Sequence, residues 1–251
     1  VMLDELQYVL GDSIFDVGMQ EYYKRWELKH PNEVRYKAAM EETSGEELDW
    51  FFDPWLHDTQ ILDYGIKDWK RSQKSDGSWA VDIDLVKYGT REMPQLLEVK
   101  LEDGSKERIW WKNHQWRKQD TFSFQLSKKP VAIILDPDVK TIDVDRRNNH
   151  SNGLPSTWMF RWPGMNWNHR DSYLHQWSPA LNYHELDGYM PGLWLSRAYG
   201  SWQRTDLRIN YGIKSEEIYW DLRSMRKPVH RVTGLRYNFH AFYQGGLSSV
   251  S

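Results

Sequence analysis

The stretch 44–64 constrains the fold most, because a helical pattern ends there and a strand pattern begins. Ser44 is a good N-cap, and Glu47 three residues later completes a capping box, so a helix is predicted to begin here. Its apolar residues recur at i, i+3, i+4 and i+7 and form one aromatic face that has to be buried. These residues are Leu48, Phe51, Phe52 and Trp55.

Pro54 limits that helix, since proline removes one backbone hydrogen bond and clashes with the preceding turn. We expect the helix to kink or stop near Asp53. After residue 60 the apolar residues alternate instead, at Leu62, Tyr64 and Ile66, which predicts a strand. The change of period predicts a domain boundary near residue 60.

The composition narrows the class of protein. At 251 residues the chain is long enough for one large or two ordinary domains. A net charge of -3 and a pI of about 6.3 give no electrostatic reason to expect nucleic acid as a partner. Without cysteine the chain has no disulfides and no thiolate metal sites. The sequence contains no apolar run of about 18 residues, so no transmembrane helix is predicted, and no signal peptide is recognisable.

The ends of the sequence predict that this is an internal piece of a longer protein. The opening VMLDELQYVLG starts within a helical pattern, without a cap or an initiator Met, and meets a stop at Gly11. The closing GGLSSVS directly follows an alternating segment. The 15 Trp, 14 Tyr and 8 Phe have two open explanations, sugar-stacking sites or the interface belts of a membrane β-structure.

Residues 1–60 are predicted to form three or four short helices. Asp12 or Ser13 caps the second helix, and Asn32 caps a third that ends before Gly45. The second helix has an apolar face with spacings of +4, +7 and +11. That face consists of Phe15, Met19, Tyr22 and Trp26. Periodicity by itself indicates a helical scaffold and no chemistry.

The residue order in this segment resembles the helices that follow the zinc site in gluzincin aminopeptidases of the aminopeptidase N and leukotriene-hydrolase type. Three blocks carry the resemblance: L-x-x-L-x-x-x-L-G-x-x-x-F, then Y-Y-x-x-W with K-H-P, then S-G-x-x-L-x-x-F-F-x-x-W-L. Pro54 departs from the pattern, where a polar residue commonly stands. The matching residues are Leu3, Leu6, Leu10, Gly11, Phe15, Tyr22, Tyr23, Trp26, Lys29, His30, Pro31, Ser44, Gly45, Leu48, Phe51, Phe52, Trp55 and Leu56.

The resemblance implies that the parent protein is a zinc metallopeptidase, whose catalysis needs H-E-x-x-H and a distant Glu. This chain has no H-E-x-x-H, and the nearest string, His184-Glu185-Leu186-Asp187-Gly188, lacks the second His. The family's oxyanion-stabilising Tyr would also precede Leu3. We therefore expect zinc and a peptide substrate in the parent protein only. In this fragment we expect no catalytic, cofactor-binding or metal-binding residue and no activity.

Residues 61–147 are predicted to form a β-sandwich, because short alternating segments are separated by turn signals. Asp103-Gly104 is a strong hairpin signal among them. A small β-sandwich often accompanies the catalytic domain in the resembled family. The predicted strands lie at 79–85, 97–101, 109–111, 122–126, 131–135 and 142–144.

Two functional interpretations of this part stay open beside structural ones. A calcium cluster competes with solvated loop carboxylates, since the D-x-D-x-D-G spacing is missing. Its residues are Asp136, Asp138, Asp143 and Asp145. A sugar-stacking face competes with ordinary packing of the sandwich. Its residues are Trp110, Trp111 and Trp116.

Residues 148–190 are predicted to be a linker, Trp-rich and irregular, and residues 191–251 to contain antiparallel strands. In the last segment Leu235, Tyr237 and Phe239 share one face, and polar residues share the other. Such segments are typical of transmembrane β-barrel strands. The run Asn182–Leu193 resembles the entry to the barrel of bacterial outer-membrane surface-antigen-like proteins. A second soluble sheet is the open alternative.

Three histidines of the tail, His169, His175 and His184, are spaced by 6 and 9 residues. These spacings fit neither one helix face nor adjacent strand positions, which favours scattered loop histidines over a metal site. No phosphate-binding loop, nucleophile elbow or pair of catalytic carboxylates is recognisable.

The sequence thus predicts an α+β fold: a short helical subdomain, an antiparallel β-sandwich, and further antiparallel strands in an incomplete barrel or sheet. The predicted function is scaffold and membrane anchor within a bacterial zinc metallopeptidase of the cell envelope, periplasm or outer membrane. Outer-membrane association would involve residues 191–251, and no nucleic acid is expected. The alternative is a Trp-rich β-sandwich module that binds glycans or peptides at the cell surface.

Overall fold

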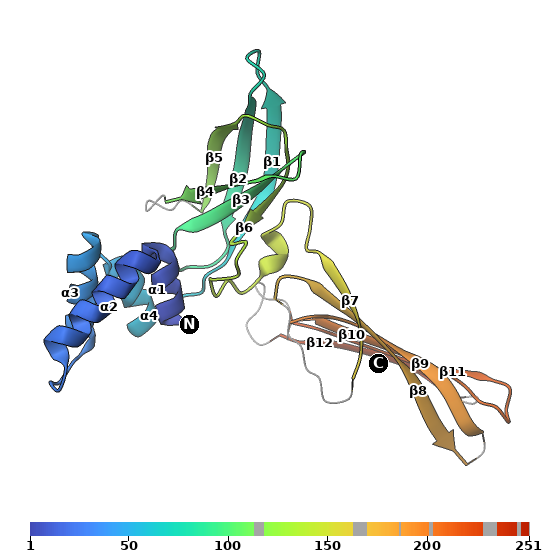
Figure 1. The fold of residues 1–251 in the computed structure, drawn as a ribbon. Helices are drawn as coiled ribbons and strands as arrows, with labels where there is room; N and C mark the ends of the chain where they lie inside the picture. Colours follow the sequence, from blue (N-terminus) through green and yellow to red (C-terminus); the bar gives the residue numbers. More distant parts are fainter. Residues whose placement is uncertain are drawn as a thin grey trace. The chain divides into compact units, whose positions relative to one another are not determined.

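The computed structural model describes residues 1–112, 118–162, 170–185, 187–200, 203–227, 235–244 and 247–250. The chain forms two compact units, Val1–Gly153 and Leu154–Ser251. Figure 1 shows the α-helices at the start of the first unit, a short helix near residue 147, and strands in the other elements of both units. The predicted α+β class with antiparallel sheets is confirmed. Among the described helices, none is both long and apolar enough to span a membrane.

Four α-helices open the first unit: α1 Met2–Leu10, α2 Asp12–Trp26, α3 Glu33–Ser44 and α4 Asp49–Leu56. Gly11, with φ 83°, separates α1 from α2 and serves as the N-cap of α2, in place of the predicted Asp12 or Ser13. Asn32 caps α3 as predicted, because its side chain accepts a hydrogen bond from the backbone N–H of Arg35 at 3.1 Å.

The capping box predicted at Ser44 and Glu47 is wrong. Ser44 is the last residue of α3, because Gly45 adopts a left-handed conformation with φ 69° and ends that helix. The next helix begins only at Asp49. Glu41, from the preceding helix, reaches the backbone N–H of Leu48 at 2.9 Å and satisfies it in place of a local cap.

The sequence predicts that α4 kinks or stops near Asp53. The helix does not stop there, because it continues through Pro54 to Leu56. Proline stands in the last turn, where few further backbone hydrogen bonds remain to be lost. The predicted burial of the aromatic face holds for Leu48, Phe51 and Phe52. They share one core cluster with residues of the first three helices, namely Leu6, Leu10, Phe15 and Met40.

The β-sandwich of the first unit consists of two three-stranded antiparallel sheets, with the orders β1-β2-β5 and β4-β3-β6. Its core contains the inward-facing residues of both sheets, such as Val81, Ile83, Leu97 and Val99. Gly104, with φ 83°, forms the predicted hairpin turn between β3 and β4. The strands are β1 Tyr64–Gln73, β2 Trp79–Lys87, β3 Gln95–Leu101, β4 Lys106–Trp111, β5 Gln119–Leu126 and β6 Pro130–Leu135.

The segment 142–144, predicted as a strand, lies in none of the described strands. Its backbone groups bond elsewhere: the N–H of Ile142 donates to Glu5 at 2.7 Å, and that of Val144 to the carbonyl of Leu62 at 3.1 Å. A short 3₁₀ helix, η1 Arg146–Asn148, follows. The segment thus fastens the helices and the sandwich to each other.

The second unit is one seven-stranded sheet, in the order β13-β12-β11-β10-β9-β8-β7. Neighbouring strands are antiparallel except for β7 and β8, which are parallel. The strands are β7 Ser156–Phe160, β8 Tyr173–His184, β9 Gly188–Tyr199, β10 Gln203–Tyr211, β11 Ile218–Arg226, β12 Tyr237–Gln244 and β13 Leu247–Val250.

This sheet corrects the interpretation of 148–190 as an irregular linker, since β7, β8 and the start of β9 lie in that range. Pro179 and the neighbouring polar residues conceal the period of two in β8. Tyr173, Trp177, Leu181 and Tyr183 nevertheless recur at even spacings. In the first unit, by contrast, the change from helix to strand at residue 60 falls within one compact body.

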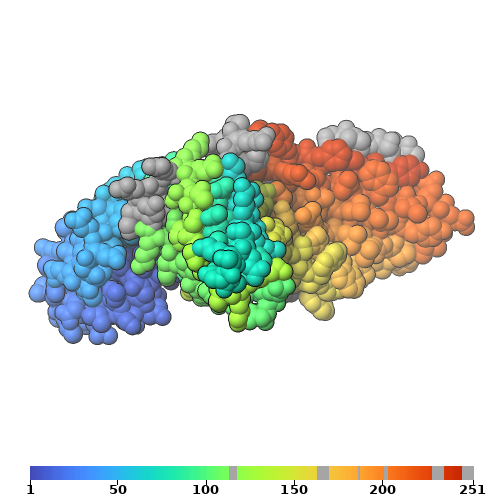
Figure 2. Space-filling model, turned by 90° about the horizontal axis from the view of Figure 1, so that it is seen from above, coloured from blue at the N-terminus to red at the C-terminus, as the bar shows by residue number. Residues whose placement is uncertain are grey.

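Glu5 joins the helices to the sandwich in the first unit. The side chain is fully buried, and its Oε2 forms an ion pair with Arg91 Nη2 at 2.8 Å and accepts a hydrogen bond from Trp55 Nε1 at 3.1 Å. Its Oε1 accepts the Ile142 N–H. Figure 2 shows the blue helices in contact with the cyan and green strands of this unit. Tyr8 adds a second contact, because its hydroxyl oxygen accepts a hydrogen bond from the backbone N–H of Leu96 at 3.3 Å.

Replacing Glu5 by Ala should destabilise the first unit by about 3–5 kcal/mol, because it leaves the buried Arg91 guanidinium without its carboxylate. Urea unfolding followed by tryptophan fluorescence measures the loss. Glu47→Ala is the matched control, since Glu47 is exposed and should change the free energy of unfolding by no more than about 0.5 kcal/mol. Equal effects of the two substitutions would contradict the role assigned to Glu5.

Candidate functional site

The register of the seven-stranded sheet sorts its side chains into an apolar and a polar face. Successive residues of a strand point to opposite sides, and directly paired residues point to the same side. Leu195 pairs with Leu207, and Leu207 with Leu222, which places aliphatic side chains on one face. Asp206, one residue away, pairs with Ser196 and Arg223 on the other face.

The apolar face is largely exposed in the described part of the sheet. Leu181 is 67% exposed and Trp158 66%. Soluble proteins rarely expose a contiguous apolar patch of this extent without a binding partner or a membrane to cover it. The exposed large side chains of this face are Trp158, Trp177, Leu181, Tyr183, Tyr189, Leu193, Ile209, Tyr211, Ile218, Trp220, Tyr237 and Phe239.

Residue types change along the apolar face. At the β8–β9 hairpin Tyr183 and Tyr189 pack together, with ring centroids 5.4 Å apart. Aliphatic pairs occupy the middle of the strands. Towards the other end Thr205 and Ser224 pair across strands, with hydroxyl oxygens 3.0 Å apart, and Arg197 lies over the ring of Tyr173. An aliphatic band therefore lies between an aromatic end and an end that combines polar side chains with Tyr237 and Phe239.

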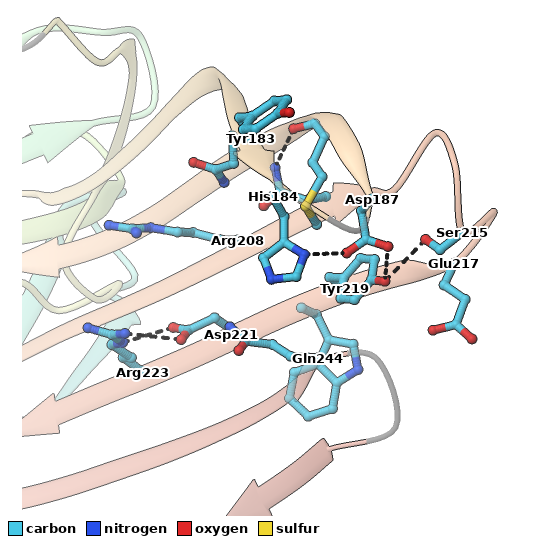
Figure 3. Close-up of a pocket in the computed structure, with 14 residues that line it drawn as sticks. Tyr183, His184, Asp187, Arg208, Ser215, Glu217, Tyr219, Asp221, Arg223 and Gln244 are labelled. Carbon is cyan, nitrogen blue, oxygen red and sulfur yellow. Dashed lines mark hydrogen bonds and ion pairs between the residues drawn. The ribbon is translucent and has the colours of Figure 1, made fainter.

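The polar face contains a pocket of about 750 Å³, shown in Figure 3. At one end the Tyr219 hydroxyl donates to Asp187 at 2.8 Å and lies 3.1 Å from the Ser215 hydroxyl. Asp187 also pairs with His184 Nδ1 at 3.1 Å. The Tyr219 hydrogen bond is the main reason that the pKa of Asp187 lies below its usual value.

This set of side chains contains a serine, a histidine and an aspartate but does not form a nucleophilic triad. Nucleophilic catalysis needs the base in hydrogen-bond contact with the nucleophile. Here the His184 imidazole contacts the Asp187 carboxylate, and the Ser215 hydroxyl contacts the Tyr219 hydroxyl, with no hydrogen bond between the serine and the imidazole among the described residues. The contacts join the β8–β9 hairpin to the turn that precedes β11.

A second polar cluster of this face surrounds Trp194. The guanidinium carbon of Arg161 lies 3.6 Å from the Trp194 ring centroid, and that of Arg208 lies 4.5 Å from it. The indole N–H donates to Asp206 at 3.1 Å, and Arg204 donates to the same carboxylate at 2.7 and 3.2 Å. This cluster was not predicted from the sequence, although the alternation Arg204-x-Asp206-x-Arg208 within a strand indicates one charged face.

The four aspartates considered as a calcium cluster instead form ion pairs and hydrogen bonds with other groups of the protein. Asp136 is buried and pairs with Arg146 at 2.7 Å. Asp138 accepts two hydrogen bonds from Arg108, at 2.8 and 2.9 Å. No group of three or more potential metal ligands occurs among the described residues. The alternative of solvated loop carboxylates fits the exposed Asp138 and is corrected for the others, because Asp136, Asp143 and Asp145 are 0%, 1% and 7% exposed.

Two buried carboxyl groups of this region have strongly raised pKa values. Burial, reinforced by the neighbouring Asp143, raises the pKa of Asp63 to about 8. Burial raises the pKa of Asp143 itself to about 6, although the backbone N–H groups of Tyr64 and Asp145 donate to it. Both groups therefore keep their proton to a higher pH than an ordinary aspartate does.

The raised pKa of Asp63 predicts that the first unit loses stability as the pH rises from about 4 to about 8. Across that window the native state keeps a proton that the unfolded chain has released, so each pH unit costs up to about 1.4 kcal/mol. Asp63→Asn, which stays neutral, should gain stability over the wild type as the pH rises. Urea unfolding at pH 5, 6, 7 and 8 measures the difference.

The control for that experiment is Asp16→Asn, at an exposed position of α2. Its free energy of unfolding should follow the wild-type pH dependence. A difference between Asp63→Asn and the wild type that stays constant from pH 5 to 8 would contradict the raised pKa.

The other described aromatic and histidine candidates pack against or pair with neighbouring side chains. Trp111 is buried in the sandwich core, and Trp110 packs on Tyr8 with centroids 4.9 Å apart, so neither offers a free stacking face. His175 stacks on Trp158 at 4.5 Å, and His184 pairs with Asp187. Two remaining candidates, Trp116 and His169, lie outside the described residues.

Comparisons with known proteins give a weak structural similarity and no sequence match. No protein-family model matches the chain, and no curated protein matches its sequence. Among solved structures, the chain is similar to aminopeptidase A of Legionella pneumophila in complex with aspartic acid, with 14% identity and a TM-score of 0.39. The similarity covers 53% of this chain and 15% of that chain.

Proposed function

We propose that residues 154–251 anchor the protein in a bacterial outer membrane, with the apolar face of the seven-stranded sheet against lipid. One observation carries this proposal: the large exposed apolar residues of the sheet lie on one face, and its charged residues, apart from Arg197 and Arg226, lie on the opposite one. A soluble sheet with one solvated face has the reverse arrangement. Apolar-out and polar-in alternation is the pattern of membrane β-barrel strands.

The order of residue types along the strands supports the same proposal. Membrane β-strands have an apolar band flanked by aromatic residues at the two interfaces. Tyr183 and Tyr189 stand at one end of the aliphatic band, and Tyr237 and Phe239 stand towards the other. The strands β8 to β11 have 9 to 12 residues, close to the roughly 9–11 that span a bilayer when tilted.

We further propose that residues 1–153 are the scaffold of a zinc metallopeptidase related to aminopeptidase N. Support comes from the residue order of the four helices, in which the aromatic residues of the resembling blocks, such as Phe51 and Phe52, form the core. In this proposal the zinc ligands, the catalytic Glu and the peptide site belong to the parent protein outside this segment. The chain supplies structural support and the anchor.

Binding of glycans or peptides at the cell surface is the second candidate function. It is favoured by Trp158, Trp162 and Trp177, which are 66%, 62% and 44% exposed near β7 and β8. Exposed indole rings offer flat stacking faces for sugars. Loss of glycan binding in Trp158→Ala, without any change in lipid association, would favour this candidate over the anchor.

The anchor proposal predicts that the chain associates with phospholipid vesicles and that brominated lipid tails quench its tryptophans. Leu207→Arg, in the middle of the aliphatic band, should weaken insertion by about 2–4 kcal/mol. Gln244→Arg is the matched control, because it adds the same charge to the polar face of β12. Flotation and quenching that are equal for the wild type and Leu207→Arg would contradict the proposal.

The scaffold proposal predicts that the purified chain hydrolyses no aminoacyl amide and binds zinc at well below one ion per molecule. Its described residues hold no cluster of three potential ligands. Zinc is measured by elemental analysis after dialysis, and hydrolysis by release of a chromogenic amine. Measurable peptidase activity of the chain would place an active site within it and contradict the proposal.

A further inference from the structure

The polar face of the sheet carries more positive than negative charge around Trp194. Arg161, Arg204 and Arg208 converge there, and Asp206 is the one carboxylate shown to bond to this cluster among the described residues. The segments outside the described ranges contain no Asp or Glu, so they supply no further side-chain carboxylate. Three guanidinium groups therefore face one carboxylate.

Arg161 is the least satisfied of the three. The backbone N–H of this residue donates to the Trp177 carbonyl at 2.8 Å, which holds Arg161 next to β8 and directs its side chain to the polar face. Its Nη1 is buried and has no hydrogen-bond partner among the described residues. Burial lowers the pKa of Arg161, and the charges of Arg204 and Arg208 lower it further. An anion would relieve both penalties.

The nearby carboxylates are already engaged. Asp206 accepts hydrogen bonds from Arg204 and Trp194 on its two oxygens. Asp221 accepts from Arg223 at 2.9 and 3.1 Å, and its Oδ2 lies 3.0 Å from His240 Nε2. Neither carboxylate has a hydrogen bond with Arg161 or Arg208 in the described structure. These two guanidinium groups retain donors for a further acceptor.

We propose that Arg161 and Arg208, supported by Arg204 and Trp194, form a binding site for a phosphate group on the polar face of the sheet. Three guanidinium charges against one carboxylate leave a charge of two, which a phosphate dianion balances and a single carboxylate does not. Guanidinium groups match phosphate oxygens with paired donors. Arg208 also lines the 750 Å³ pocket, which leaves room for a phosphomonoester beside the site.

Titration of the purified chain with inorganic phosphate, followed by calorimetry at pH 7.5 and low salt, tests the site. Saturable binding is expected, at least tenfold weaker in Arg161→Gln and in Arg208→Gln. Arg197→Gln is the matched control, because Arg197 also lies over an aromatic ring but on the apolar face. It should bind as the wild type does. Near-ultraviolet circular dichroism establishes that each variant is folded.

Several results would overturn the site: no saturable phosphate binding, equal binding by the wild type and both glutamine variants, or equal loss in Arg197→Gln. Acetate tests the charge balance, since a monoanion should bind at least tenfold more weakly than phosphate. Equal affinity for the two anions would overturn the assignment to a dianion. If a glutamine variant unfolds, Arg161→Lys keeps the charge and should retain more binding than Arg208→Gln.

The phosphate site and the membrane anchor can fail independently, because they occupy opposite faces of the same sheet. Vesicle flotation of Arg208→Gln should equal that of the wild type, while its phosphate binding is weakened. Leu207→Arg, one residue earlier, should show the opposite combination when it is folded in detergent. Glycerol 3-phosphate should compete with inorganic phosphate, and a failure to compete would contradict recognition of the phosphate group.

Discussion

The alternation of side chains along an extended strand determines how both units use their apolar residues. In the first unit, two three-stranded sheets face each other, so that Val81 and Ile83 of one sheet meet Leu97 and Val99 of the other in a common core. In the second unit, the described strands form a single sheet. Many of its large apolar side chains, sorted by the same rule, remain exposed on one face, and most of the charged ones gather on the opposite face. The same alternation of side chains thus buries apolar residues in the first unit and leaves many of them exposed in the second.

Within the first unit, a few buried polar groups fix the helices on the sandwich. An apolar contact tolerates sliding, whereas Glu5 has to meet Arg91, Trp55 and the backbone N–H of Ile142 together. A single displaced partner leaves a buried charge uncompensated. The neighbouring Asp136 and Arg146 pair follows the same logic in the loop that replaces the expected sixth strand. Geometry at this joint is therefore specified by hydrogen bonds and ion pairs rather than by shape alone.

Sequence patterns predicted the fold where one local signal decided the outcome. The element boundaries predicted at Gly11, Asn32 and Gly104 are confirmed. A positive φ or a capping side chain depends on few neighbouring residues, so a local pattern predicts it well. The capping box failed because the left-handed Gly45 makes Ser44 the end of α3, and the next helix begins only at Asp49, where Glu41 accepts the Leu48 N–H. The strand β8 was missed because Pro179 interrupts its composition without interrupting its period.

The candidate site was harder to predict, since its members come together only through strand register. Arg161, Trp194 and Arg208 lie on or beside three different strands, and no sequence spacing relates them. The motif Arg204-x-Asp206-x-Arg208 indicates one charged face of one strand, but the pairing of β9 with β10 places Trp194 beside it. The calcium interpretation of the aspartates between 136 and 145 failed for the same reason. Tertiary contacts bring Arg108 and Arg146 to these carboxylates, and the sequence spacing does not show this.

The parallel pairing of β7 with β8 has a consequence for the order of folding. From β8 onwards each strand pairs with its successor, so the contacts of β8 to β13 are local and can form hairpin by hairpin. β7 is parallel to β8, with Ser156 opposite Tyr173 and Phe160 opposite Trp177, so it cannot pair through a tight hairpin turn. This edge strand, with Trp158 and Phe160, is thus expected to join last and to be the first to detach.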